Sequence, residues 1–369
     1  MNYKTCQLFS LVNLPTGKVN QSEVNNILEH INKDSKEQLL VFTILWDVVH
    51  LPHDSWKTIT NQLENFLQRK NIKILLLLSD WLKGKIEIFH HNNLEVQYVN
   101  GIALTAYLEI FKKNKAIAND KWNPNTGKFL FLTGKWYKDN RFKLFCELEK
   151  NNLISSAVYS LFIPKKYPTN FDSYINKIIT EEKYYDFYNK FNCNPDNTRT
   201  LTHGEDQGYF THHVSAIPYD VNLYKSTSFR LISETEWNGT PNEFDDGCDP
   251  WLTEKTWIPI FNKHPFIIAG QKYTLKKLKK LGFKTFEEYL PVKNYDLLDN
   301  KQRMDAIVQN VEFWIKNIKN FQSSIESDVV HNYNNLIAYC QKDYDLLQFL
   351  IDKYKLKTNV YRLTEMTFY

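Results

Sequence analysis

A short stretch in the middle of the chain concentrates side chains that suit an anionic ligand. An apolar run that is typical of a buried strand ends at two carboxylates, Glu234 and Glu236. After a polar gap, Thr253 precedes Glu254 and Lys255 at the start of a second apolar run. Threonine is a favourable N-cap residue, so the pattern predicts that Glu254 and Lys255 lie in the first turn of a helix.

These positions define a chemistry. The carboxyl ends of buried parallel strands are where ligands of open α/β sheets bind. A helix N-terminus offers unpaired N–H groups and the positive end of a dipole, and Lys255 adds a formal charge for a phosphate. Glu254 can accept hydrogen bonds from ribose hydroxyls, so the combination predicts a site for a nucleoside diphosphate. The alternative is ordinary: a glutamate that stabilises a first helical turn beside a solvated lysine.

The same stretch resembles the donor-binding signature of the α-1,3-fucosyltransferase family. The matching segments are Ser233-Glu234-Thr235-Glu236, Trp251-Leu-Thr-Glu-Lys255 and Pro265-Phe-Ile-Ile-Ala-Gly270, with Thr235-Glu236 where the family has Asn-Ser. Upstream, Phe129 to Arg141 repeats the family's order of strand, polar loop and helix-starting arginine. The chain also resembles uncharacterised phage and bacterial glycosyltransferase-like proteins, and the likeness spans roughly residues 128–290.

The resemblance implies an activity and a role for each residue. Arg141 and Lys255 would neutralise the diphosphate of a GDP- or UDP-sugar, Thr253 would cap the helix at the donor, and Glu254 would bind the ribose. Glu234 would lie near the donor sugar or support the loop, with Glu236 beside it. The implied enzyme is an inverting glycosyltransferase that needs no metal and no cofactor other than its donor. For Arg141 alone, the alternative is a surface arginine on a helix.

Deprotonating the acceptor hydroxyl would need a base. Asp47 and Asp80 each follow an apolar strand run in the first third of the chain, and Asp47 is the first choice. Either aspartate could instead simply cap the helix that follows it. A second group of candidates lies in one polar loop and comprises His203, Asp206, His212 and His213.

No metal site is expected. Asp245-Asp246 and Asp343-Tyr344-Asp345 superficially resemble an Asp-x-Asp metal motif. The first pair lies in a predicted loop. The second lies inside an amphipathic helix, where neighbouring side chains point apart.

The candidate residues lie in a chain where short apolar runs alternate with amphipathic helical segments. Such an alternation predicts parallel sheets that are covered by helices on both faces. The expected strands are 39–45, 73–78, 94–99, 128–134, 157–162, 228–233 and 265–269. The expected helices include a stripe at Trp56, Ile59, Leu63 and Phe66, and the segments 103–113, 141–150, 302–320 and 335–354. The predicted fold class is therefore α/β, and by resemblance GT-B-like, with two Rossmann-like domains whose parallel sheets face a cleft, plus C-terminal helices.

A polar segment at 114–127 contains Asn-Pro-Asn-Thr-Gly and is typical of a linker. We therefore expect an acceptor domain at 1–120 and a nucleotide-sugar donor domain at 121–300. Residues 301–369 are expected to form a helical tail that could pack back on the first domain.

Length and composition restrict the remaining possibilities. The 369 residues are 43% hydrophobic, enough for two cores, and the net charge of +4 is small for a dedicated nucleic-acid-binding protein. Five dispersed cysteines and the lack of a long apolar run predict a cytoplasmic protein without a membrane span. The acceptor is expected to be a saccharide or glycan precursor. The alternatives are DNA that carries 5-hydroxymethylcytosine, or a non-catalytic protein that binds a nucleotide or acts as a scaffold.

Overall fold

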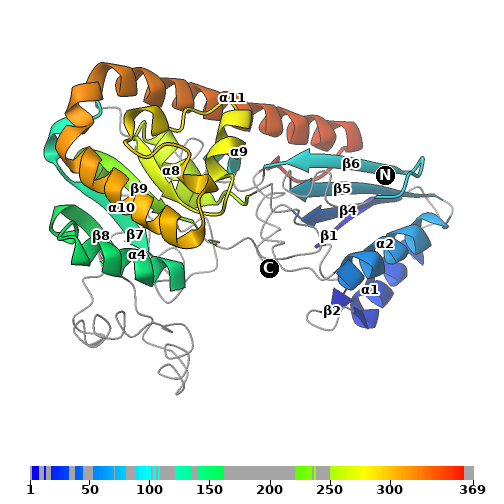
Figure 1. The fold of residues 1–369 in the computed structure, drawn as a ribbon. Helices are drawn as coiled ribbons and strands as arrows, with labels where there is room; N and C mark the ends of the chain where they lie inside the picture. Colours follow the sequence, from blue (N-terminus) through cyan, green and yellow to red (C-terminus); the bar gives the residue numbers. More distant parts are fainter. Residues whose placement is uncertain are drawn as a thin grey trace. The chain divides into compact units, whose positions relative to one another are not determined.

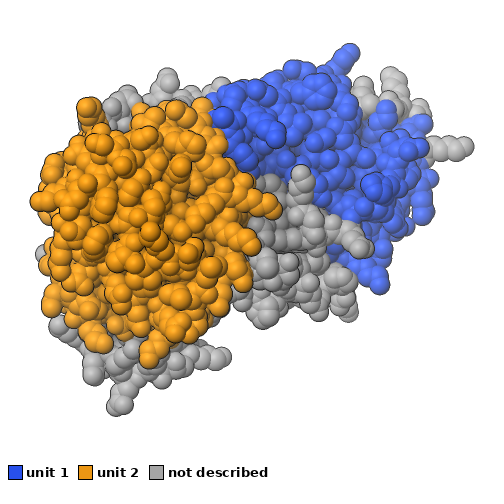
Figure 2. All heavy atoms as spheres, turned by 45° about the horizontal axis from the view of Figure 1, so that its top comes forward, with its two compact units in different colours: residues 1–108, 240–249, 338–369 blue, residues 109–239, 250–337 orange. Residues whose placement is uncertain are grey.

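In the computed structural model, the chain folds into two compact units (Figures 1 and 2). Unit 1 comprises residues 1–108, 240–249 and 338–369, and unit 2 comprises residues 109–239 and 250–337. Within these units the structure describes residues 2–7, 12–13, 18–32, 38–44, 53–69, 71–79, 88–100, 103–104, 107–108, 121–133, 139–161, 221–234, 237 and 250–360.

Unit 1 contains a four-stranded sheet whose described strands are all parallel. They are β1 (Asn2–Gln7), β4 (Gln38–Ile44), β5 (Ile72–Ser79) and β6 (Leu94–Val99). Their order across the sheet, β1-β4-β5-β6, is also their order along the chain. The sequence predicted the last three of these strands and missed β1, which lies at the edge of the sheet.

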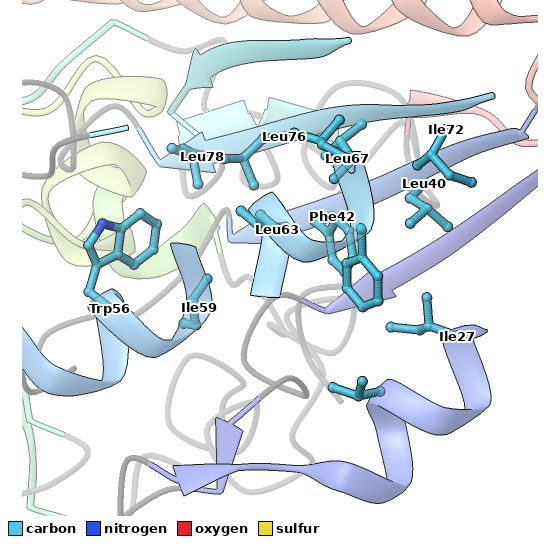
Figure 3. Close-up of a cluster of buried hydrophobic side chains, with 13 residues drawn as sticks. Ile27, Leu40, Phe42, Trp56, Ile59, Leu63, Leu67, Ile72, Leu76 and Leu78 are labelled. Atoms are coloured by element: carbon cyan, nitrogen blue, oxygen red, sulfur yellow. The ribbon is translucent and has the colours of Figure 1, made fainter. Parts of the chain in front are cut away.

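Helices α1 (Gln21–Asn32) and α2 (His53–Leu67) share one apolar core with β4 and β5 (Figure 3). A short hairpin of β2 (Val12–Asn13) and β3 (Lys18–Val19) precedes α1. The stripe on α2 follows from helical spacing, because positions three and four apart share a face. Its members Trp56, Ile59, Leu63 and Phe66 are all buried.

Unit 2 contains a second four-stranded parallel sheet. It is built from β7 (Phe129–Thr133), β8 (Ala157–Leu161), β9 (Phe229–Ser233) and β10 (Phe266–Ala269). The order across the sheet is β8-β7-β9-β10, so the chain leaves β7 toward one edge and returns to add strands on the other side.

Helices cover both faces of the unit 2 sheet. They are α4 (Asp139–Lys150), α7 (Val221–Lys225), α8 (Glu254–Phe261), α9 (Thr274–Lys280) and α10 (Asn300–Asn317). Alternate residues of each strand point to opposite faces. Leu130 and Leu132 of β7 therefore pack with Ile258 of α8, whereas Phe129 stacks on Phe229 and so joins the aromatic core around Trp314 of α10.

The last long helix, α11 (Gln322–Tyr354), begins in unit 2 and continues into unit 1 from residue 338. It starts earlier than the helix predicted at 335–354. Within unit 1, Asp343 accepts a hydrogen bond from the Asn100 amide at 2.7 Å, and Lys353 pairs with Glu95. Among the described residues, no helix is both long enough and apolar enough to cross a membrane.

The two parallel sheets, one in each unit, and their flanking helices confirm the predicted α/β class. The helical tail expected at 301–369 is divided between the units, because α10 and the first part of α11 group with unit 2.

Candidate functional site

The reversal of strand order in unit 2 fixes where a ligand can approach its sheet. β7 and β9 are neighbours, and the connections that leave their carboxyl ends run to opposite edges of the sheet. In open α/β sheets, ligands bind just outside the carboxyl ends of the strands at such a switch point. The segments that begin there are α4, which follows β7, and the loop and helix α8 that follow β9.

Glu234 is the first residue after β9 and is almost fully buried. Its amide donates to the Ala269 carbonyl at 2.8 Å, so the backbone still pairs with β10. Its carboxylate accepts from the Thr253 amide at 3.1 Å and from the hydroxyls of Thr253 and Thr256, each at 2.5 Å. Of the two roles expected for Glu234, these bonds are those of a support that fixes the first turn of α8 against the sheet.

Thr253 caps α8, as the sequence predicts. Its backbone is extended (φ −103°, ψ −178°), and its hydroxyl accepts from the Lys255 amide at 3.4 Å. The hydroxyl of Thr253 thus links the Glu234 carboxylate to the helix start. Thr256, which sequence reasoning did not single out, belongs to the same network.

Lys255 and Glu254 form an ion pair at the N-terminus of α8, with Nζ and Oε1 2.7 Å apart. The lysine side chain is 7% exposed and the glutamate side chain 17%. The ammonium also reaches the Thr253 hydroxyl at 3.3 Å. A cation in the first turn opposes the helix dipole, which costs stability but adds to the attraction for an anion.

Arg141 lies in the first turn of α4 and is 2% exposed. Its Nη2 donates to the backbone carbonyl of Glu234 at 3.4 Å. The structure therefore places Arg141 against the segment that follows β9. Arg141 is thus not the exposed surface arginine that was the alternative expectation. The two halves of the predicted signature, 93 residues apart in sequence, meet at this contact.

The two residues that follow β10, Gly270 and Gln271, contact the segments of this network. A Cβ at Gly270 would lie 3.2 Å from the Thr274 hydroxyl and 3.4 Å from the Glu234 Cβ, so glycine permits the close approach of Glu234. Gln271 Oε1 accepts from the Trp251 amide at 2.9 Å. Lys277 of α9 donates to the Pro250 carbonyl at 2.9 Å, so α9 helps to hold the segment that leads into α8.

Arg303, on α10, is a buried cation at the same edge that sequence reasoning missed. Its Nη2 donates to the Trp237 carbonyl at 2.9 Å and to Asn300 Oδ1 at 2.6 Å, and its guanidinium lies 4.2 Å from the centre of the Trp237 ring. Burial lowers the pKa of Arg303 to about 10, so it remains charged at neutral pH. The sequence did contain one indication that Arg303 is buried. It precedes Ile307 by four residues and so lies on the buried stripe of α10.

The other candidates of the sequence analysis cannot be placed relative to this network. Asp47, Asp80 and Glu236 lie outside the described residues. So do the loop candidates His203, Asp206, His212 and His213 and the pair Asp245-Asp246.

The remaining aspartates lie on the part of α11 that belongs to unit 1 and hold structural contacts there. Asp343 binds the Asn100 amide, and Asp345 accepts from Gln341 at 2.7 Å. In the described part of the chain, no three histidine, cysteine, aspartate or glutamate side chains are grouped as metal ligands would be.

No protein-family model matches the chain, and no curated protein matches it in sequence. Among solved structures, it is similar to an α,α-trehalose-6-phosphate synthase from Burkholderia multivorans. The identity is 11% and the TM-score 0.36, over 89% of this chain and 68% of that protein.

Proposed function

We propose that unit 2 binds a nucleoside diphosphate-sugar and that the protein is a glycosyltransferase. The observation that carries the proposal is the position of Arg141 and Lys255, two buried cations at helix N-termini beside one switch point. Both helix N-termini direct the positive end of a dipole to this edge, which is an environment that favours a diphosphate.

Each residue then has a role in donor binding. Lys255 and Arg141 balance the charge of the diphosphate, and Glu254 accepts from the ribose hydroxyls. Thr253 and Glu234 keep the first turn of α8 in place through their hydrogen bonds. By the resemblance of its signature to α-1,3-fucosyltransferases, a GDP-sugar is the first donor to test and a UDP-sugar the second.

The reaction is a displacement at the anomeric carbon of the donor. The bond from that carbon to the diphosphate oxygen breaks, and a bond to the acceptor oxygen forms on the opposite face of the sugar. The acceptor proton passes to a base, for which Asp47 and then Asp80 remain the predicted residues. Positive charge held in place at the diphosphate stabilises the departing group without a metal ion.

A saccharide or glycan precursor is the proposed acceptor. Donor binding is tested first, by melting the full-length protein with GDP, UDP, CMP and the corresponding sugars. A ligand that binds only the folded protein raises its melting temperature. We expect a rise with one diphosphate and a smaller or no rise with CMP. A protein that no nucleotide stabilises would contradict the proposal and favour a non-catalytic scaffold.

Hydrolysis of the selected nucleotide-sugar without acceptor then tests for chemistry. We expect slow release of sugar by the wild type and none by Lys255→Ala or Glu254→Ala. The control is Lys301→Ala, because Lys301 is an exposed residue on α10. Wild-type rates in both site variants would remove these residues from the donor site.

A further inference from the structure

The positive charge of the chain is concentrated in one segment of unit 2. Residues 255–286 contain eight lysines and no aspartate or glutamate. The whole chain carries a net charge of only +4, so the rest of the sequence is net negative. A small net charge therefore hides a strongly basic region, and it is the local charge that determines which partner a surface attracts.

Some of these lysines serve the fold of unit 2. Lys279 pairs with Glu287 at 2.6 Å, Lys277 binds the Pro250 carbonyl, and Lys255 pairs with Glu254. Four others are exposed and form no ion pair with any described carboxylate. We call them the α9 lysine surface: Lys272, Lys276, Lys280 and Lys284.

The arrangement of this surface follows from the helix that carries it. Leu275 and Leu278 of α9 are buried, so Lys276 and Lys280, one turn apart, lie on its outer side. Lys272 precedes the helix and Lys284 follows it. Lys280 lies in the last turn of α9, where a cation suits the helix dipole, and the Lys276 ammonium lies 5.7 Å from the centre of the Tyr273 ring. The two lysines still repel each other, because like charges four residues apart on a helix are unfavourable.

The chemistry of the surface fits a repeating anion. Lysine is a compact point charge on a flexible stem, which suits phosphates that need no fixed geometry. Leu275, Leu278 and Phe283 of this segment are buried in unit 2, and Leu281 is half-buried. The segment therefore lacks the exposed apolar face that a membrane-binding amphipathic helix requires.

We propose that the α9 lysine surface binds the phosphate backbone of a nucleic acid. The surface belongs to the same unit as the proposed donor site, and Lys277 and Gln271 of its segment hold Pro250 and Trp251 just before α8. The inference does not depend on donor binding. It concerns a second anionic partner with its own contacts.

The test is binding of a fluorescent, mixed-sequence DNA duplex to the full chain over a range of salt concentrations. The variant replaces all four lysines: K272Q/K276Q/K280Q/K284Q. Its control removes the same charge from exposed lysines elsewhere: K128Q/K301Q/K319Q/K342Q. Each lost phosphate contact reduces the steepness of the fall of log affinity with log salt by about 0.9. The steepness should therefore decrease by about 3–4 in the surface variant and by much less in the control variant.

Several outcomes would overturn the inference: a wild type that does not bind the duplex at about 50 mM salt, a surface variant that keeps the wild-type slope, or equal losses in both variants. Binding to anionic lipid vesicles but not to the duplex would assign the surface to a membrane. An unchanged melting temperature shows that the surface variant folds. If it does not fold, K276Q/K280Q should lose about half the slope. The nucleotide-induced melting shift should persist in every variant, which separates this result from failure of the donor site.

Discussion

The two units differ in how their parallel sheets are wound. In unit 1 the described strands β1, β4, β5 and β6 follow one another in chain order across the sheet, whereas in unit 2 the order reverses between β7 and β9. A reversal separates the connections on either side and leaves space for a ligand at the carboxyl ends of the strands. Of the two described parallel sheets, only that of unit 2 therefore has the topology of a nucleotide site.

The buried charges follow the same division. In unit 2, Arg141, Glu234, Lys255 and Arg303 lie in segments at the carboxyl edge of the sheet. The unit also buries Glu147, Arg230, Glu287 and Asp296 elsewhere. In the described part of unit 1, the buried carboxylate of Asp343 lies on α11 and binds a backbone amide. Burial of charge is costly unless it is compensated, so charges gathered at one edge indicate a function there, and a single capped aspartate indicates a structural contact.

The largest effect is expected from Glu234→Ala. The substitution leaves the Thr253 amide and the Thr253 and Thr256 hydroxyls without their charged acceptor, and we expect the free energy of unfolding to fall by about 3–4 kcal/mol. Chemical denaturation measures this loss. Glu288→Gln, at an exposed glutamate, is the control and should change stability by less than about 0.5 kcal/mol. Equal effects would mean that Glu234 does not fix the start of α8.

Acid should weaken unit 2 through His264, which lies at the amino end of β10. Complete burial lowers the pKa of His264 to about 4, so the folded state keeps it neutral while the unfolded chain protonates it near 6.5. The unfolded state binds more protons between these values, so stability falls as pH drops from 6.5 to 4, by up to about 3 kcal/mol. Denaturation at pH 7 and pH 5 measures the decline. His264→Asn should flatten it, and an unchanged slope would contradict the assignment.

Donor binding should depend on Lys255. Removing a buried cation that contacts a diphosphate costs about 1.5–3 kcal/mol, so Lys255→Ala should weaken nucleotide affinity about 10- to 100-fold. Calorimetric titration with the nucleotide found in the melting screen provides the measurement. Lys301→Ala is the control, because substitution of this exposed lysine should leave nucleotide affinity unchanged. Equal affinities for the two variants would place the diphosphate elsewhere.

The smallest effect is expected in unit 1. Asp343→Asn keeps an oxygen for the Asn100 amide but removes its charge, and should lower the free energy of unfolding by about 1 kcal/mol. Nucleotide affinity should not change. A loss of nucleotide affinity comparable with that of Lys255→Ala would contradict the assignment of donor binding to unit 2 and of a structural role to Asp343.

Much of the sheet structure could be predicted from sequence. The strands β4, β5, β7, β9 and β10 are short apolar runs, and fully buried parallel strands have this signature. The Thr253 cap was also visible, because N-capping depends on local sequence. By contrast, β1 contains polar residues at the edge of its sheet and carries no such signal.

The network around Glu234 could be predicted only in part. Its neighbours Thr253 and Thr256 follow 19 and 22 residues later, and no local pattern pairs a carboxylate with a particular helix start. Arg303 is the clearer case: an arginine on an amphipathic helix is usually exposed, and its burial depends on Trp237, 66 residues away. Contacts of this kind depend on tertiary packing, which periodicity does not encode.

Hydrogen–deuterium exchange with and without the preferred nucleoside diphosphate tests the central claim most directly. Binding at the switch point should slow amide exchange at the start of α4 and across residues 251–257, and leave α1 and α2 of unit 1 unchanged. Loss of this protection in Lys255→Ala, but not in Lys301→Ala, would link it to the proposed contact. Protection confined to unit 1, or protection of unit 2 that persists in Lys255→Ala, would contradict a donor site at the junction of β7 and β9.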